Sequence, residues 1–239
     1  MDEKSEVRKK KPFSIYALAK GKPGKKFTIK EFLTITKNAK KKPGGPLTDG
    51  KIMLDDGYVY EADSKQEITA LKKLIYHKAF KRLRGQCIAV PYRYKRKINN
   101  YYPDFILLTQ TNKIIVIEIK SVSEMNTKLN KRKYYALRKY CNEHGYLYLM
   151  CDRNFVSFET LEGRSVSIRV AQAIEKALEE KGYFDLEDYN QLFKQLKKNK
   201  NWLQKHVGIY LAQNSNLKMM GDLERKSSDF KIMRKRGKK

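Results

Sequence analysis

Apolar positions recur along the chain in two periods, and together they predict a mixed α/β domain. The segment KIIVIEIKS (113–121) is almost entirely apolar, which indicates a strand buried on both faces and central in its sheet. YPDFILLT (102–109) before it and YLYLMCD (146–152) after it are predicted as further strands. Between 130 and 145, NKRKYYALRKYCNEHG predicts a helix that ends at Gly145. The strand–helix–strand order makes 113–152 a βαβ unit, so its two strands are expected to be parallel.

The clearest helical period lies upstream, in DSKQEITALKKLIYHKAFKRLRG (63–85). Ser64 is the expected N-cap of this helix and Gly85 its expected end. The apolar residues that follow helical spacing are Ile68, Leu71, Ile75 and Ala79. CIAVPYRYKRKINN (87–100) then predicts a strand and a basic turn, and KIMLDDGYVYEA (51–62) predicts a hairpin with Asp-Gly at its turn. The predicted core is therefore ordered α-β-β-β-α-β.

Beyond residue 160 the pattern changes to helices. SVSIRVAQAIEKALEEKGYF (165–184) and DLEDYNQLFKQLKKNKNWLQKHVGIYLAQ (185–213) predict a small helical module or a winged helix. We therefore divide the chain into a basic N-terminal arm (1–44), an α/β domain (45–160), a C-terminal helical module (161–221) and a basic polar tail (222–239).

The distribution of charge along the chain indicates the kind of partner that the protein binds. The formal net charge is +27, from 53 basic and 26 acidic residues. Residues 1–44 hold 14 basic and 4 acidic residues, and residues 191–239 hold 14 and 3, so the excess collects at both ends. Such ends favour double-stranded DNA or another nucleic acid as partner, because each neutralised phosphate releases counterions. A lysine-rich solvated surface is the plainer alternative, but it accounts better for a charge of a few units than for one of this size.

Cysteine content and hydropathy indicate the compartment in which the protein is expected. The cysteines Cys87, Cys141 and Cys151 match no zinc-binding spacing and are expected to be reduced, partly buried thiols. No run approaches the roughly 20 apolar residues of a membrane span. The N-terminus lacks the apolar core of a signal peptide, and the basic ends lack a long amphipathic helix with an aromatic face. We expect a cytoplasmic protein with no membrane partner.

Three charged residues interrupt the most apolar part of the chain. Asp104 opens one predicted strand, and Glu118 and Lys120 lie two positions apart on the next, so their side chains share a face. Buried charges are costly unless they are paired or bound to metal. Adjacent strands can bring Asp104 beside Glu118, and two carboxylates with the carbonyl of Ile119 suit a hard cation such as Mg²⁺, for which Mn²⁺ could substitute.

Such an arrangement suits hydrolysis of a phosphodiester bond. A bound divalent cation offsets charge in the transition state and lowers the pKa of water. Lys120 can hold or activate that water and stabilise developing charge. For an isolated E-x-K pattern, an ion pair at the exposed end of a strand is the plainer interpretation. Here the preceding Pro-Asp dipeptide and the otherwise apolar strand favour a catalytic site.

PDF at 103–105 and EIK at 118–120 resemble the signature of the PD-(D/E)XK nuclease superfamily. The resemblance implies a restriction-endonuclease-like αβββαβ core, which agrees with the order expected from the hydrophobic pattern. Within the superfamily, the chain looks most like TnsA-type transposon endonuclease subunits, over about residues 50–155. Those typically show S-x-x-E on the first helix, a PDF strand, an E-x-K strand, a helix with Asn and Lys, and a strand after Gly. This chain has Ser64 to Glu67, YPDF, VIEIKS, LNKRKYYAL and HGYLYLM.

The resemblance implies further roles that the residues themselves leave open. Glu67 would be a third metal-site carboxylate, but Ser64 and Glu67 also form a capping box. Lys131 or Lys133 would lie near the scissile phosphate, but that helix is basic throughout, so a solvated face is the plainer interpretation of both. The resemblance also implies a transposase partner that cuts the other strand and a regulatory ATPase of the same element.

Aromatic and basic residues alternate at 92–96, where Arg93, Lys95 and Arg96, with Lys97 after them, could grip the DNA backbone. A strand that buries its tyrosines is an equal alternative. The leading hypothesis is a Mg²⁺-dependent DNA endonuclease that cuts transposon ends together with a transposase, which would dock on residues 166–212. The alternatives are a stand-alone endonuclease of the same superfamily, in restriction, phage defence or junction resolution, and a non-catalytic DNA-binding protein.

Overall fold

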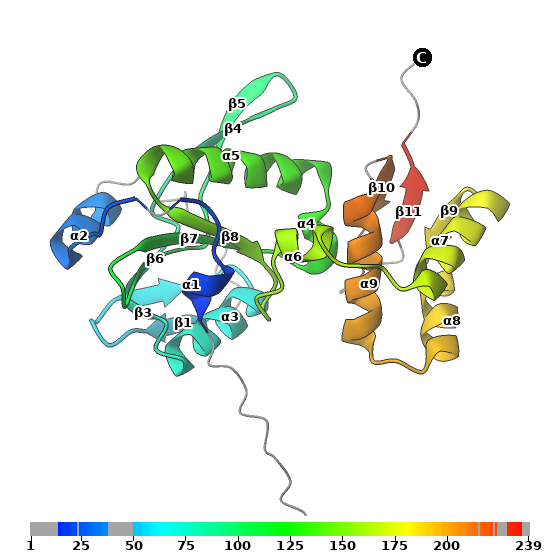
Figure 1. Cartoon of the computed structure of the whole chain (residues 1–239), viewed down its shortest axis with the longest axis horizontal. Helices are drawn as coiled ribbons and strands as arrows, with labels where there is room; N and C mark the ends of the chain where they lie inside the picture. The colour runs from blue at the N-terminus through cyan, green and yellow to red at the C-terminus, as the bar shows by residue number, and fades with distance from the viewer. Residues whose placement is uncertain are drawn as a thin grey trace, which may run out of the picture.

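The structure, a computed structural model, describes residues 14–22, 24–37, 50–214, 216–221, 223 and 229–235. Much of the expected basic arm, at 1–13 and 38–44, lies outside the described residues, and so does the end of the expected tail, at 236–239. Figure 1 shows an α/β domain beside a smaller C-terminal module. The prediction of a mixed α/β protein is confirmed.

Four strands form the central sheet. Their order is β3 (Phe80–Gly85), β6 (Phe105–Thr109), β7 (Ile114–Ile119) and β8 (Leu147–Cys151). β6 pairs antiparallel with β3 and with β7, whereas β7 and β8 are parallel, as the βαβ pattern predicts. Every residue of β6, β7 and β8 is buried, which explains their nearly continuous apolar sequences.

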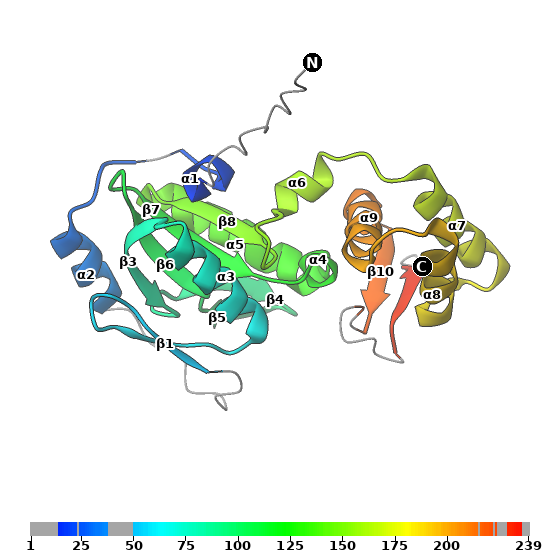
Figure 2. The same cartoon turned by 90° about the horizontal axis from the view of Figure 1, so that it is seen from below.

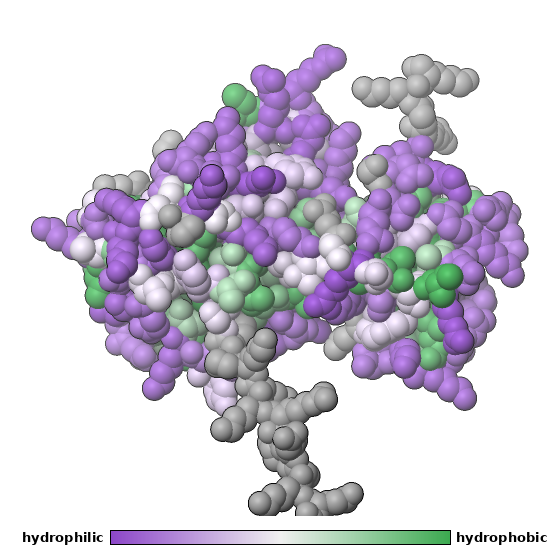
Figure 3. Space-filling model, viewed as in Figure 1, coloured by the Kyte–Doolittle hydropathy of each residue, from purple (hydrophilic) through white to green (hydrophobic). Residues whose placement is uncertain are grey.

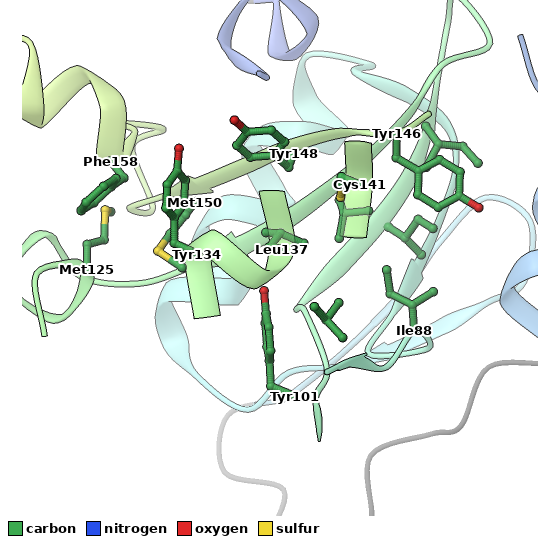
Figure 4. Close-up of a cluster of buried hydrophobic side chains, with 14 of the residues drawn as sticks. Ile88, Tyr101, Met125, Tyr134, Leu137, Cys141, Tyr146, Tyr148, Met150 and Phe158 are labelled. Atoms are coloured by element: carbon green, nitrogen blue, oxygen red, sulfur yellow. The ribbon is translucent and has the colours of Figure 1, made fainter. Parts of the chain in front are cut away.

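Two helices cover opposite faces of this sheet. α3 (Lys65–Tyr76) packs Leu71 and Leu74 into one buried cluster. α5 (Lys128–His144) packs Leu137 and Cys141 into the other. Figure 4 shows this second cluster, in which the α5 side chains meet tyrosines and methionines from β8 and its neighbours. Because strand residues alternate between faces, even-numbered positions of β7 point toward α5 and odd-numbered ones toward α3.

The upstream helix is shorter than the sequence predicts. α3 ends at Tyr76, and residues 80–85 form β3. Lys78 has a φ of 47°, in the left-handed region, which a continuing α-helix excludes. The prediction was wrong because β3 is an edge strand whose single buried residue, Leu83, produces no alternating pattern. Gly85 ends this strand and not the helix, and a Cβ there would lie 2.3 Å from the Tyr60 ring.

Residues 87–100 add no strand to the central sheet, again contrary to the prediction. They belong to a separate two-stranded hairpin, β4 (Val90–Tyr94) and β5 (Lys97–Tyr101), which projects past α5 in Figure 1. The chain order of the sheet and its covering helices is α3-β3-β6-β7-α5-β8. The hairpin is inserted before β6, and the short helix α4 (Val122–Met125) lies between β7 and α5. The order of a helix, three strands, a helix and a strand is thus present, but its first strand is β3.

Other elements precede α3. The hairpin predicted at 51–62 is confirmed as β1 (Lys51–Met53) and β2 (Val59–Glu61), and Gly57 in its turn has a φ of 76°. α1 (Ile15–Leu18) and α2 (Ile29–Lys37) lie further upstream. The backbone of Lys20 pairs with Tyr148, so this upstream segment borders the end of the sheet at β8.

The C-terminal module has its own sheet and core. After α6 (Phe158–Glu162) come α7 (Ile168–Glu180), β9 (Tyr183–Asp185), α8 (Leu186–Leu196), α9 (Lys200–Gln213), β10 (Leu217–Met220) and β11 (Lys231–Arg234). The strands form an antiparallel sheet in the order β10-β11-β9. The expected polar tail therefore contains a middle strand, on which Ile232 is fully buried. Its sequence looked polar because one residue of the strand is buried among basic neighbours.

Helix α9 joins the module to the α/β domain. Figure 2 shows it beside α4, and it also contacts α6. Gly208 permits this approach, since a Cβ there would lie 2.0 Å from a methyl carbon of Val122. The Asn126 side-chain amide donates to the Gly208 carbonyl across the same contact at 3.2 Å. Among the described residues, no helix has the length and apolar character needed to cross a bilayer.

Candidate active site

Adjacent strands bring together the three charged residues that interrupt the apolar segment. Asp104 immediately precedes β6, and Glu118 lies one residue before the end of the neighbouring β7. The Ile119 backbone N–H donates to Asp104 Oδ2 at 2.7 Å, which ties the two strand ends together. Lys120 follows β7, and its backbone N–H donates to the Cys151 carbonyl at 2.9 Å. The expected proximity of Asp104, Glu118 and Lys120 is therefore present.

Lys120 lies between the two carboxylates. Its Nζ is 2.9 Å from Glu118 Oε1 and 3.9 Å from Asp104 Oδ2. The same ammonium donates to the Ile119 carbonyl at 2.9 Å. Asp104 is 6% exposed and Glu118 is 3% exposed, so this is a buried group and not the exposed strand-end ion pair of the plainer interpretation.

The electrostatics of the group are unbalanced. Burial raises the pKa of Asp104 well above its ordinary value, and the charge of Glu118 raises it further. Burial lowers the pKa of Lys120, but the charges of Glu118 and Asp104 outweigh burial and hold it above its ordinary value. Lys120 is therefore charged at neutral pH. One ammonium carries a single positive charge beside two carboxyl groups, so the group has room for added positive charge.

The group fits a divalent cation. Glu118 Oε2 is buried and has no hydrogen-bond partner, and such an oxygen is costly unless a proton or cation meets it. Asp104, Glu118 and the carbonyl of Ile119 would hold the ion, since Mg²⁺ prefers oxygen ligands and keeps several waters. In the part of the chain that the structure describes, no three Asp, Glu, His or Cys side chains are grouped closely enough to hold a metal by themselves.

Glu67 occupies a different environment. Its Oε2 accepts from the Tyr60 hydroxyl at 2.6 Å and from the Asp63 backbone N–H at 3.1 Å, and its Oε1 accepts from Ser64 Oγ at 2.9 Å. Ser64 Oγ in turn accepts from the Glu67 N–H, so the predicted N-cap is confirmed. Both carboxylate oxygens already have protein donors, and α3 covers the face of the sheet opposite to α5. The charge of Glu67 helps to raise the pKa of Asp104, so the Glu67 carboxylate lies in the neighbourhood of the pair.

Tyr60 is a residue of this neighbourhood that the sequence interpretation missed. It is fully buried on β2, its ring lies 5.0 Å from that of Phe105, and Gly85 leaves the space for it. The sequence offers only a weak signal, a glycine at the end of an edge strand. Through its hydroxyl, Tyr60 fixes the orientation of the Glu67 side chain.

The expected DNA-binding residues fall into two groups. Arg93, Lys95, Arg96 and Lys97 lie at the outer end of the β4–β5 hairpin. On α5, Lys131 Nζ lies 5.8 Å from the Phe158 ring, and Lys133 Nζ lies 5.3 Å from the ring of Tyr101. Lys131 and Lys133 are therefore placed beside aromatic rings. The sequence interpretation missed Lys128 and Arg132, which border the hairpin end.

Comparison of the chain with protein-family models, with curated proteins and with solved structures finds no match. The function must therefore be inferred from the site itself.

Proposed function

We propose that the protein is a metal-dependent DNA endonuclease of the PD-(D/E)XK type. The observation that carries the proposal is the group of Asp104, Glu118 and Lys120, in which one ammonium lies between two buried carboxylates and one Glu118 oxygen has no protein partner. The order α3-β3-β6-β7-α5-β8 supports the same superfamily. The net charge of +27 supports a DNA substrate.

Each residue of the group has its own task in hydrolysis. Asp104, Glu118 and the Ile119 carbonyl would hold Mg²⁺ or Mn²⁺, which supplies charge neutralisation and acidified water. The Ile119 N–H fixes the orientation of the Asp104 carboxylate. Lys120 Nζ reaches the space between the carboxylates, so it can donate to a phosphate oxygen or orient the attacking water there. Glu67 supports the neighbourhood through α3 and would act as a ligand only after leaving Tyr60.

Within the superfamily we propose the TnsA-like branch, with a transposase and a regulatory ATPase as partners. The chain combines a specific catalytic group with little equipment for reading bases. The C-terminal order of helix, strand, helix, helix, strand and strand is that of a winged helix, but its last helix, α9, lies against α4 and α6. Base readout needs an element that can enter a groove. A partner that docks on the module at 166–212 would then choose the DNA site.

A stand-alone endonuclease is the second candidate. The basic residues at the end of the β4–β5 hairpin favour it, because they could hold DNA without a partner. A non-catalytic DNA-binding protein is less well supported. Two buried carboxylates around one ammonium cost folding free energy and repel phosphates, and binding alone gives them no use.

The experiment is a cleavage assay in Mg²⁺ on DNA that carries the end of the transposon. The full chain is assayed alone and together with the products of neighbouring genes. The proposal predicts weak nicking by the protein alone and site-specific cutting in the complex. Efficient site-specific double-strand cutting by the protein alone would move the assignment to the stand-alone nuclease. Full cutting by Asp104→Ala or Glu118→Ala would reject the site.

A further inference from the structure

A basic cleft lies between the end of the β4–β5 hairpin and the first turns of α5. Its volume is about 520 Å³, and it is lined by Arg93, Tyr94, Lys95, Arg96, Lys128 and Arg132. Five of these six residues are cationic and none is acidic. In Figure 3 hydrophilic side chains dominate the surface of this region. The cleft therefore presents concentrated positive charge from two separate elements.

The hairpin that forms one wall is braced against α5. The Tyr101 hydroxyl donates to the Lys133 carbonyl at 3.1 Å, and Arg132 Nη1 donates to the Arg93 carbonyl at 3.0 Å. Lys95 and Arg96, with φ of 48° and 63°, close the turn between the paired strands. Two positive φ values are typical of the tight turns that fit the twist of a hairpin. The hairpin backbone that carries Arg93, Lys95 and Arg96 is thus held against α5.

Within the described part of the chain, these cations lack acidic partners. Among the described residues, none of the five forms an ion pair with a carboxylate. Like charges gathered around one cleft repel each other, and an anion with several negative charges relieves that repulsion. One guanidinium group can donate two parallel hydrogen bonds to the oxygens of one phosphate. A phosphodiester backbone, which presents a row of phosphates, is therefore the best-matched ligand.

The cleft is distinct from the catalytic group. The hairpin stem runs from Tyr101 to its turn over five residues, or roughly 15 Å at the usual rise of a strand. Asp104 follows three residues after Tyr101, at the other end of that stem. Duplex DNA presents a phosphate about every 3.4 Å along each strand. A backbone contact at the hairpin end of the cleft would therefore lie about one stem length, or several nucleotides, from the end of the hairpin that leads to Asp104.

We propose that this cleft binds the sugar–phosphate backbone of duplex DNA away from the cut and holds the duplex on the α5 side of the protein. The inference rests on the proposed DNA substrate. It adds Lys128 and Arg132 to the contact and leaves out Lys131 and Lys133, which do not line the cleft. The hairpin then acts as a positioning arm joined to the strand that begins beside Asp104.

The test compares two variants with equal charge loss. Arg93→Gln/Arg96→Gln removes two cleft cations, and Lys65→Gln/Lys72→Gln removes two exposed lysines from α3, on the opposite face of the sheet. Affinity for a duplex oligonucleotide several helical turns long is measured in EDTA over a salt titration. The cleft variant should lower the slope of log affinity against log salt by about 2, because each phosphate contact contributes about 0.9. The α3 variant should leave the slope close to that of the wild type.

Equal slopes for the cleft variant and the wild type, or for the two variants, would overturn the proposal. Lys128→Gln serves as a second variant that leaves the hairpin untouched, and it should lower the slope by about 1. The salt titration is repeated with the same substitutions in a Glu118→Gln protein, so that the measurement of binding does not depend on catalytic activity. Loss of slope there supports the cleft even if the wild type never cuts DNA. A normal slope in a protein that does cut rejects the cleft and leaves the nuclease assignment standing.

Discussion

Asp104→Asn should stabilise the protein in the absence of metal and remove its response to Mg²⁺. Asparagine has the shape of aspartate and keeps an oxygen that can accept from the Ile119 N–H, now 2.7 Å away. Lys120 keeps its nearer partner, Glu118, at 2.9 Å, so the substitution leaves no buried ammonium unpaired. What it removes is one of two carboxylates that share a single cation.

The magnitude follows from the burial of Asp104. A carboxyl whose pKa is higher in the folded than in the unfolded protein binds protons more tightly when folded, so stability falls as pH rises through the range between the two values. Ionisation of Asp104 is therefore a net cost to folding, and relieving such a cost at a functional site typically gains about 0.5–2 kcal/mol. Mg²⁺ at 100 times its Kd would stabilise the wild type by about 2.7 kcal/mol and the variant by nothing. The order of the two stabilities should therefore reverse when Mg²⁺ is added.

The assay is denaturant unfolding of both proteins in EDTA and in Mg²⁺. Asp152→Asn is the matched control, because Asp152 is also a buried aspartate whose pKa burial raises, but it accepts from backbone N–H groups outside the site. The control should respond to Mg²⁺ as the wild type does. An Asp104→Asn variant that is less stable than the wild type in EDTA, or one that gains as much from Mg²⁺, would refute the reasoning.

Three further substitutions test other contacts. Lys120→Met leaves Glu118 and Asp104 without their ammonium and should cost about 3 kcal/mol in EDTA, with part regained in Mg²⁺; unchanged stability in EDTA would contradict the buried pair. Tyr60→Phe removes the donor to Glu67 and should cost about 1.5–3 kcal/mol in denaturant unfolding, so a neutral result would mean that the bond adds nothing. Gly208→Ala pushes a methyl group into Val122 and should cost about 1–3 kcal/mol and increase proteolysis between α6 and α7, and no change in either would argue against the α9–α4 contact.

Sequence patterns predicted the interior of the α/β domain well, because its strands are buried on both faces. The continuous apolar runs that became β6, β7 and β8 can hardly pack in any other way, and the helix that became α5 ends at Gly145 with a φ of 69°, as a C-terminal glycine signal predicts. The proximity of Asp104 and Glu118 followed from the same regularity, since each lies at a fixed place on neighbouring strands.

Elements at edges and in small sheets were missed for the opposite reason. β3 and β11 each bury a single residue, Leu83 and Ile232. Neither strand therefore shows the alternation of apolar and polar residues that would distinguish it from a helix end or a polar tail. The environment of Glu67 could not be predicted either. A capping residue and a metal ligand look alike in sequence, and the hydrogen bond from the Tyr60 hydroxyl to Glu67 depends on tertiary packing that the sequence pattern does not reveal.

The most direct test of the central claim is nicking of supercoiled plasmid DNA by the full chain, alone and with the products of neighbouring genes, in Mg²⁺ or Mn²⁺ and in EDTA. Glu118→Gln, purified in parallel, is the comparison, since it keeps the shape of the site and removes one carboxylate charge. The account predicts metal-dependent nicking by the wild type that EDTA abolishes and that Glu118→Gln lacks while it still binds the plasmid. Nicking by Glu118→Gln at the wild-type rate would contradict the account. So would a wild type that binds DNA but cuts it neither alone nor with the products of neighbouring genes in Mg²⁺ or Mn²⁺.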